Sequence, residues 1–259
     1  MNIKIKKNNL KITIITVCYN SEKTIRKTLE SIESQAFKKI EHIIVDGKST
    51  DNTLSIIKEY SFKRKIISEH DKGIYDAMNK GIKLVEGDII GFLNSDDFYA
   101  NNDILSKVSS IFKNNPSLDA CYADVICTDR NDISKDIRYA KSSKFTPGLF
   151  SKGWCPPHPT FFVRSSVYEQ FGNFNLNYHI ASDVELMMRF IEVHKINVRY
   201  IPELWIKMRM GGTSNNSFKN IFIQNKEILH ALNSHNLPNN LINFFFHKII
   251  SRSLQFLKK

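Results

Sequence analysis

Short apolar runs alternate with amphipathic segments over the first hundred residues, and this alternation limits the fold more than any other feature of the chain. Apolar runs of this length are typical of buried strands, and apolar residues at helical spacing indicate helices. We expect strands at 12–17, 42–45, 66–68 and 89–93, and helices beginning near Ser21, Thr53 and Gly73. Strands that alternate with helices form a mostly parallel sheet covered by those helices. The sequence therefore predicts an α/β fold.

The expected strand at Ile89–Leu93 runs directly into Asn94-Ser95-Asp96-Asp97. Open α/β sheets bind their ligands outside the carboxyl ends of the strands. Neighbouring side chains on an extended strand point to opposite faces, so the two acids can serve one ligand only if the chain turns there. One carboxylate can then hold a divalent cation while the other accepts from a hydroxyl of the same ligand. The alternative is a solvated turn that caps the next helix.

The first expected strand is not followed by a glycine-rich phosphate loop. Val17-Cys18-Tyr19-Asn20-Ser21 contains no glycine, which excludes a dinucleotide fingerprint and a P-loop at this position. A nucleotide bound here needs another way to neutralise its phosphates. A cation held by the acidic pair would provide one.

Positive charge is concentrated near the C-terminus. Residues 201–259 carry 8 basic and 2 acidic side chains, so +6 of the formal net charge of +11 lies there. A basic tail on a nearly balanced body indicates an attachment surface, and no nucleic-acid partner is expected. The four cysteines have no C-x-x-C pair, and we expect them to be reduced. No apolar stretch approaches the roughly 18 to 20 residues of a membrane span, and we expect a cytoplasmic protein.

Four segments keep a fixed order along the chain, namely Thr16–Asn20, Val45–Asp51, Glu69–Gly81 and Asn94–Asp97. Together they resemble the ordered motifs of family 2 glycosyltransferases, most closely bacterial members that build lipopolysaccharide, capsule or exopolysaccharide chains. The resemblance covers residues 11 to about 212. It implies a GT-A fold and an inverting transfer from a nucleotide-diphospho-sugar, expected to be a UDP-sugar, to a glycan acceptor that is expected to be lipid-linked.

The resemblance implies roles for residues around the nucleoside. Asp46 would accept the imide N–H of uracil, a contact that a carboxylate makes well. Tyr19 and the backbone near Thr16 would pack against the base, and Asp71 would lie against the nucleoside. A plain turn aspartate before Gly47 remains the alternative for Asp46.

The same resemblance places further residues along the donor. Asn79 would face the phosphates or the sugar, although a surface role is also open. Asp96 would take a ribose hydroxyl, and Asp97 would hold Mg²⁺ or Mn²⁺, which suit carboxylate and phosphate oxygens. The cation would offset charge on the departing phosphate.

The second half of the chain resembles the acceptor side of the family. Within Ile180–Leu186, the family pattern makes Asp183 the base that takes the proton of the attacking hydroxyl. The alternative is a helix cap in front of a buried apolar stripe. His158 would contact the acceptor or the diphosphate, and a structural histidine between two prolines is the alternative.

These patterns divide the chain into a domain at 1–212 and a helical tail at 213–259. The domain would hold a nucleotide-binding half at 11–100 and an acceptor half at 101–212, and Gly211–Ser214 would form a loop over the donor or a linker. The tail combines apolar and basic residues. It could pack on the domain, form a homodimer, or bind an anionic membrane surface as a peripheral protein.

Two other functions remain open from the sequence. A sugar-nucleotide pyrophosphorylase shares the fold class but needs a glycine-rich basic loop after the first strand, which is absent. A non-catalytic sugar-nucleotide-binding module is the second, and the presence of Asp183 argues against it.

Overall fold

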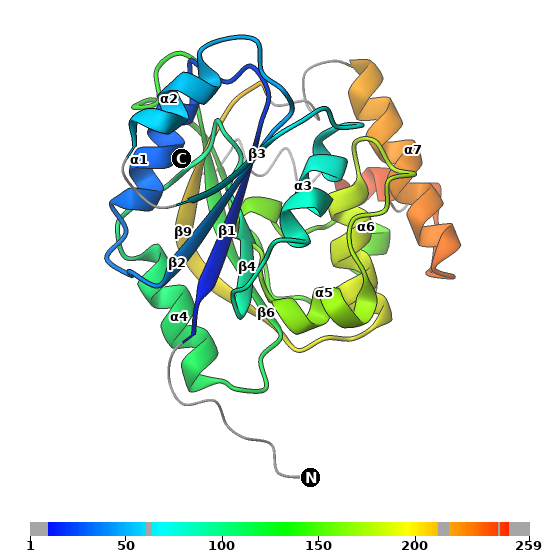
Figure 1. The fold of residues 1–259 in the computed structure, drawn as a ribbon. Coiled ribbons are helices and arrows are strands. Elements are labelled where there is room, and N and C mark those ends of the chain that lie inside the picture. The colour runs from blue at the N-terminus through cyan, green and yellow to red at the C-terminus, as the bar shows by residue number, and fades with distance from the viewer. Residues whose placement is uncertain (1–9, 61–63, 212–217, 243, 249–259) are drawn as a thin grey trace.

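The computed structural model describes residues 10–60, 64–211, 218–242 and 244–248, and Figure 1 shows their arrangement. Its centre is a nine-stranded sheet in the order β3-β2-β1-β4-β8-β6-β9-β5, with β7 paired to β6. The strands are β1 (Ile12–Cys18), β2 (Ile40–Asp46), β3 (Arg64–Ser68), β4 (Ile89–Phe92), β5 (Phe98–Tyr99), β6 (Ala120–Thr128), β7 (Asp136–Ala140), β8 (Phe162–Arg164) and β9 (Val198–Arg209).

The half of the sheet built from β1 to β4 is parallel. β1 pairs in parallel with β2 and with β4, and β2 pairs in parallel with β3. Every residue of β1 is buried, which explains why its sequence is a nearly continuous apolar run and not an alternating one. Beyond β4 the sheet is mixed, because β8 runs antiparallel to β4 and β6 while β6 and β9 are parallel. The predicted α/β fold with helices on the sheet is confirmed.

Helices cover both faces of the sheet. They are α1 (Ile25–Glu33), α2 (Thr53–Glu59), α3 (Ile74–Ile82), α4 (Ile104–Asn114), α5 (Ser165–Phe171), α6 (Ser182–Met188) and α7 (Phe218–Ser234), with shorter turns at Phe150–Lys152, His158–Thr160 and Arg189–Val193. In Figure 1, α1, α2 and α4 lie on one side of the sheet, whereas α3, α5 and α6 lie on the other with α7 outside α6. One large apolar core joins the sheet to α3, α5, α6 and α7.

The described part of the tail packs on the domain. On α7, Ile228, Ala231 and Leu232 are buried in the core that also holds α6. Beyond α7, Phe244 is completely buried. The first tail segment therefore follows the packing alternative, while residues 249–259 lie outside the described part of the chain. Exposed apolar side chains remain on this tail, namely Phe222, Leu241, Ile242, Phe245 and Phe246.

The expected start of the first helix near Ser21 is wrong. α1 begins at Ile25, because the carbonyl of Ser21 accepts the backbone N–H groups of Thr24 and Ile25 in a turn that precedes the helix. Within the described ranges, no helix combines the length and the apolar composition that crossing a membrane requires.

Candidate functional site

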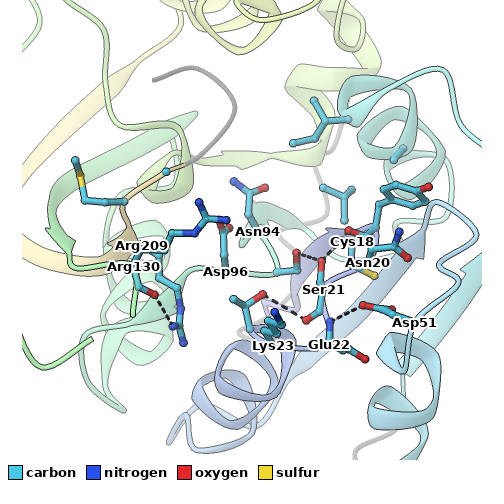
Figure 2. A pocket seen from close by; sticks show the side chains of 18 of the residues that line it. Cys18, Asn20, Ser21, Glu22, Lys23, Asp51, Asn94, Asp96, Arg130 and Arg209 are labelled. Carbon is cyan, nitrogen blue, oxygen red and sulfur yellow. Dashed lines mark hydrogen bonds between the residues drawn. The ribbon is translucent and has the colours of Figure 1, made fainter. Parts of the chain in front are cut away.

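A pocket of about 870 Å³ opens at the carboxyl ends of β1 and β4. Its wall includes the turn after β1, the start of α3, the segment after β4 and the end of β9. Figure 2 shows side chains from these separate parts of the sequence directed toward one space. This is the position at which open α/β sheets bind ligands.

The turn after β1 ties three of the sequence motifs together. Asn20, which has a positive φ of 47°, accepts a hydrogen bond from the Thr50 N–H at 2.8 Å and donates its own N–H to Ser49 Oγ at 2.8 Å. Ser21 Oγ lies 2.9 Å from Ser95 Oγ, beside the acidic pair (Figure 2). The pocket rim is therefore fixed by contacts between segments that are distant in sequence.

The structure does not bring Asp46 to the pocket, contrary to the role expected for it. Its side chain is completely buried at the end of β2. Oδ2 accepts hydrogen bonds from the Ser49 N–H at 3.0 Å and the Ser68 hydroxyl at 2.6 Å, and Oδ1 accepts one from the Ser49 hydroxyl. Both carboxylate oxygens are thus engaged within the protein. Asp46 therefore fastens the turn after β2 to β3.

The side chains of Thr16 and Asn79 also make hydrogen bonds inside the protein. Thr16 is completely buried, and its hydroxyl is hydrogen-bonded to His42 Nε2 at 3.0 Å. The Asn79 side chain donates to the Phe174 carbonyl at 2.9 Å and accepts the Phe174 N–H at 3.0 Å. The double contact of Asn79 joins α3 to the acceptor half of the chain. The Asn79 side chain is therefore engaged within the protein, whereas the contact expected of the backbone near Thr16 stays a prediction.

Tyr19 and Asp71 do reach the pocket wall. Tyr19 is 63% exposed, which is unusual for a ring of this size and leaves a face open to a ligand. Gly47 allows the two side chains to approach each other. A Cβ atom at position 47 would stand 2.6 Å from Asp71 Oδ2 and 3.4 Å from the Tyr19 ring. The Asp71 carboxylate therefore occupies the space that a side chain after Asp46 would fill.

The strand ends before the acidic pair, because β4 stops at Phe92 and the chain turns. Asp96 lines the pocket, whereas Asp97 is only 2% exposed. The turn is held by the Asp97 N–H, which donates to the Asn94 carbonyl at 3.1 Å. Burial raises the pKa of Asp97, and the neighbouring charge of Asp96 raises it further. Burial also raises the pKa of Asp96, against the opposing charges of Arg209 and Arg130.

Those two arginines are pocket residues that the sequence analysis missed. Arg209 ends β9 and Arg130 follows β6, and both line the pocket on the side of Asp96 (Figure 2). Arg209 Nη1 donates to the Arg130 carbonyl at 3.4 Å. Because β6 and β9 are adjacent and parallel, their ends deliver both cations to the same edge of the sheet. Local sequence carried no signal of that pairing.

The acidic pair fits a divalent cation whose remaining ligands a bound donor would supply. Oδ2 of Asp97 is buried and has no hydrogen-bond partner among the described residues. In the same part of the chain, no group of three or more histidine, cysteine, aspartate or glutamate side chains could hold a metal alone. Mg²⁺ is commonly bound by one or two carboxylates together with phosphate oxygens and water. Asp96 and Asp97 match that type of site.

Asp183 lies in the first turn of α6 and is half-buried. Its Oδ1 accepts hydrogen bonds from the Tyr75 hydroxyl and the Val184 N–H, each at 2.9 Å. Tyr75 directly follows Ile74, which lines the pocket. The carboxylate is therefore held by a hydroxyl of α3 and a backbone N–H of its own helix.

His158 is a core residue in this structure, contrary to the contact expected with acceptor or diphosphate. Its ring stacks on Phe92 with centroids 5.3 Å apart and meets the edge of Phe174 at 5.6 Å. Burial lowers the pKa of His158, although the charge of Asp183 acts in the opposite direction. The structural alternative describes its position. Of the expected loop Gly211–Ser214, Gly211 lines the pocket, and the other three residues lie outside the described ranges.

Residues 13–186 match the family described as Glycosyl transferase family 2. Among curated proteins, the PGL/p-HBAD biosynthesis glycosyltransferase of Mycobacterium tuberculosis is 30% identical over 208 residues, which cover 78% of each chain. The family match includes the acidic pair and Asp183, and it ends before Arg209.

Solved structures share the fold. Residues 1–349 of S. aureus TarS match with a TM-score of 0.65 at 19% identity, covering 96% of this chain and 75% of that one. The mannosyltransferase PcManGT from Pyrobaculum calidifontis, solved with GDP-Man and Mn²⁺, has a TM-score of 0.65 at 17% identity, covering 97% of this chain and 70% of that one. The likeness confirms the GT-A-type fold predicted from the sequence.

Proposed function

The chain belongs to glycosyl transferase family 2, and we propose that it moves a sugar from a UDP-sugar to a glycan acceptor with inversion, assisted by Mg²⁺ or Mn²⁺. The observation that carries the proposal is the pocket itself, in which an exposed aromatic ring, two acidic groups and two arginines surround one space. TarS has been solved with UDP and with UDP-GlcNAc, and PcManGT with GDP-Man and Mn²⁺. These complexes support a nucleotide-sugar donor and a divalent cation.

The nucleoside end of the donor belongs at Tyr19 and Asp71. The open face of Tyr19 offers a stacking surface for a base. Asp71 is the carboxylate that reaches this part of the wall, so we assign it the imide N–H of uracil in place of the buried Asp46. Asp96, which also lines the pocket, accepts a ribose hydroxyl.

The diphosphate end belongs between the acidic pair and the two arginines. Asp97, with Asp96 beside it, would hold the cation through the buried oxygen that has no partner among the described residues. Bound there, Mg²⁺ or Mn²⁺ would offset the negative charge that develops on the departing diphosphate. Arg130 and Arg209 add fixed positive charge next to Asp96, and guanidinium groups pair well with phosphate oxygens.

Asp183 is the base of the proposed transfer. An inverting reaction needs a carboxylate that takes the proton of the acceptor hydroxyl as this attacks the anomeric carbon. Asp183 is half-buried, is oriented by two hydrogen bonds, and lies beyond Tyr75 from the nucleotide pocket. The acceptor therefore approaches from the side of α3 and α6, opposite the diphosphate.

The experiment that tests this function is a donor panel. Purified protein is mixed with UDP-, GDP- or dTDP-sugars in Mg²⁺ or Mn²⁺, and the melting temperature and the release of nucleoside diphosphate are measured. We expect a UDP-sugar to raise the melting temperature and to be turned over. Stabilisation without turnover, in the presence of extracts containing glycan acceptors, would favour a binding module. Formation of a sugar phosphate from pyrophosphate would favour a pyrophosphorylase.

We further propose that the acceptor is lipid-linked and that the tail attaches the enzyme to the inner face of the membrane for surface polysaccharide biosynthesis. The support is the exposed apolar group defined above on the tail, together with the +6 charge of residues 201–259. Intact protein should sediment with anionic phosphatidylglycerol vesicles at low salt and be partly released at high salt. A Phe245→Ser/Phe246→Ser variant should bind less, because both side chains are exposed and their loss spares the core. No sedimentation of the intact protein at low salt would contradict membrane attachment, and equal sedimentation of the two proteins would contradict a role for Phe245 and Phe246 in it.

A further inference from the structure

One carboxylate of α7 holds the backbone that leads into the helix of the base. Glu227 Oε1 accepts the N–H of His179 at 2.9 Å, and Oε2 accepts the N–H groups of Ile180 and Ala181, each at 2.9 Å. The three donors are consecutive, and α6 begins at the next residue. Hydrogen bonds from backbone N–H groups to an ionised carboxylate are stronger than neutral ones.

The same backbone segment is held from the opposite side. The carbonyl of Ile180 lies 2.8 Å from the Tyr75 hydroxyl on α3, which also contacts Asp183. The Ser182 hydroxyl donates to the Asn175 carbonyl at 2.8 Å. Segment 179–182 is thus clamped between α7 and α3, with the base directly after it.

The helix that supplies Glu227 is itself well anchored. Ile228, the next residue, is buried in the core, and His235 Nε2 lies 2.8 Å from Oε1 of Glu185 on α6. Glu185 is 2% exposed and also pairs with Arg189 at 2.9 Å. Groups that hold a reactive side chain are most effective when they stand on rigid elements.

We propose that Glu227 is a positioning residue for the transfer, which makes the C-terminal helix α7 part of the catalytic apparatus. It sets the path of residues 179–181 and through them the place of the Asp183 carboxylate. The inference rests on the proposed function of Asp183 as the base. A displacement on the order of 1 Å at a reacting group can cost roughly 10²-fold in rate, so a clamp of three hydrogen bonds at this position has a measurable consequence.

The test compares Glu227→Gln with a control directly after the same helix. Glutamine keeps the size of the side chain but has one acceptor oxygen, so it cannot serve all three N–H groups. His235→Gln replaces the imidazole that contacts Glu185 by a neutral amide and leaves the 179–181 hydrogen bonds intact. Both variants should lower the melting temperature, because each weakens a polar contact between the C-terminal segment and the domain.

The rate of UDP release from the UDP-sugar that the donor panel identifies separates the two variants. We expect Glu227→Gln to lower kcat about 10- to 100-fold with donor KM within about twofold, and His235→Gln to keep kcat within about threefold. Glu227→Asp should recover part of the loss, because it retains both oxygens. Equal kcat in the two variants would overturn the positioning role and leave Glu227 as a contact that only stabilises the fold.

A double-mutant comparison shows whether Glu227 acts through Asp183. Combining Glu227→Gln with Asp183→Asn should lower residual turnover little further than Asp183→Asn alone, since the group being positioned no longer functions. If the double variant instead lost turnover by the product of the two single losses, the inference would be overturned. Near-normal turnover by Asp183→Asn alone would instead reject the base assignment, an outcome visible without any Glu227 variant.

Discussion

The Tyr75 hydroxyl lies 2.9 Å from Oδ1 of Asp183, although the two residues are 108 positions apart in sequence. Burial raises the pKa of Tyr75 well above its ordinary value, and the charge of Asp183 raises it further, so the hydroxyl remains protonated at neutral pH. Tyr75 belongs to α3, next to the pocket wall, whereas Asp183 belongs to α6. A single hydroxyl group therefore connects α3, next to the pocket wall, to the proposed base.

Tyr75→Phe should lower kcat about tenfold and change donor KM little. The substitution keeps the ring in the core and removes a hydrogen bond to a charged group, which is typically worth about 1.5–3 kcal/mol. Steady-state kinetics of UDP release would measure the effect. Tyr168→Phe is the matched control, because the Tyr168 hydroxyl is buried and has no hydrogen-bond partner among the described residues. Similar kinetics in both variants would contradict a role for Tyr75 at the base.

Asp71→Asn should weaken UDP binding and spare stability, whereas Asp46→Asn should lower stability. Asp71→Asn should weaken UDP binding roughly tenfold with little change in melting temperature, since Asp71 lines the pocket. Asp46→Asn should cost about 1–3 kcal/mol of unfolding free energy, because the buried carboxylate accepts from Ser49 and Ser68. Calorimetric titration with UDP and urea unfolding would check both. Loss of UDP binding by a fully stable Asp46→Asn protein would restore the direct contact originally expected.

Local sequence patterns predict the sheet but not the orientation of Asp46. The strand–helix alternation predicts the α/β sheet, and the end of a buried strand predicts a turn at the acidic pair. The separate roles of Asp96 and Asp97 stay a prediction. The burial of Asp46 depends on Ser68, which β3 delivers only after the strands pair. Local patterns carry no information about that pairing. The orientation of a turn aspartate therefore could not be predicted.

The same limit applies to residues that the sequence analysis missed. Arg130 and Arg209 meet because β6 and β9 pair in parallel, although β7 and β8 separate them along the chain. The apolar pattern of α7 indicated a buried face but not its partner. Only the folded arrangement places Glu227 on the backbone before Asp183.

UDP should stabilise the protein more strongly in Mg²⁺ or Mn²⁺ than in a chelator, and Asp97→Asn should remove that difference. The substitution deletes a charged ligand of the proposed cation site while nearly preserving side-chain volume. Melting curves of the parent and the variant with UDP, recorded with and without the cation, would measure this cation-dependent stabilisation. Asp103→Asn, at an exposed position before α4, should retain the response. An unchanged cation response in Asp97→Asn would contradict the site.

His42 should make the fold sensitive to acid. Burial lowers the pKa of His42 to about 3, and the nearby charge of Arg64 acts in the same direction. Because the unfolded chain takes up this proton near the ordinary value of 6.5, stability is full above 6.5 and declines as the pH falls toward 3. His42→Gln should lose less stability than the parent between pH 7 and pH 4.5, by about 1–3 kcal/mol in urea unfolding. Parallel pH profiles would contradict a neutral buried imidazole.

Donor turnover by Asp183→Asn is the most direct test of the proposed transfer. Asparagine preserves the side-chain size and can still accept from Tyr75 and Val184, but it cannot take the proton of the acceptor hydroxyl. We predict UDP binding within about twofold of the parent and transfer lowered by roughly 10²- to 10⁴-fold. Near-normal transfer by a variant that binds UDP normally would contradict the assignment of Asp183 as the base.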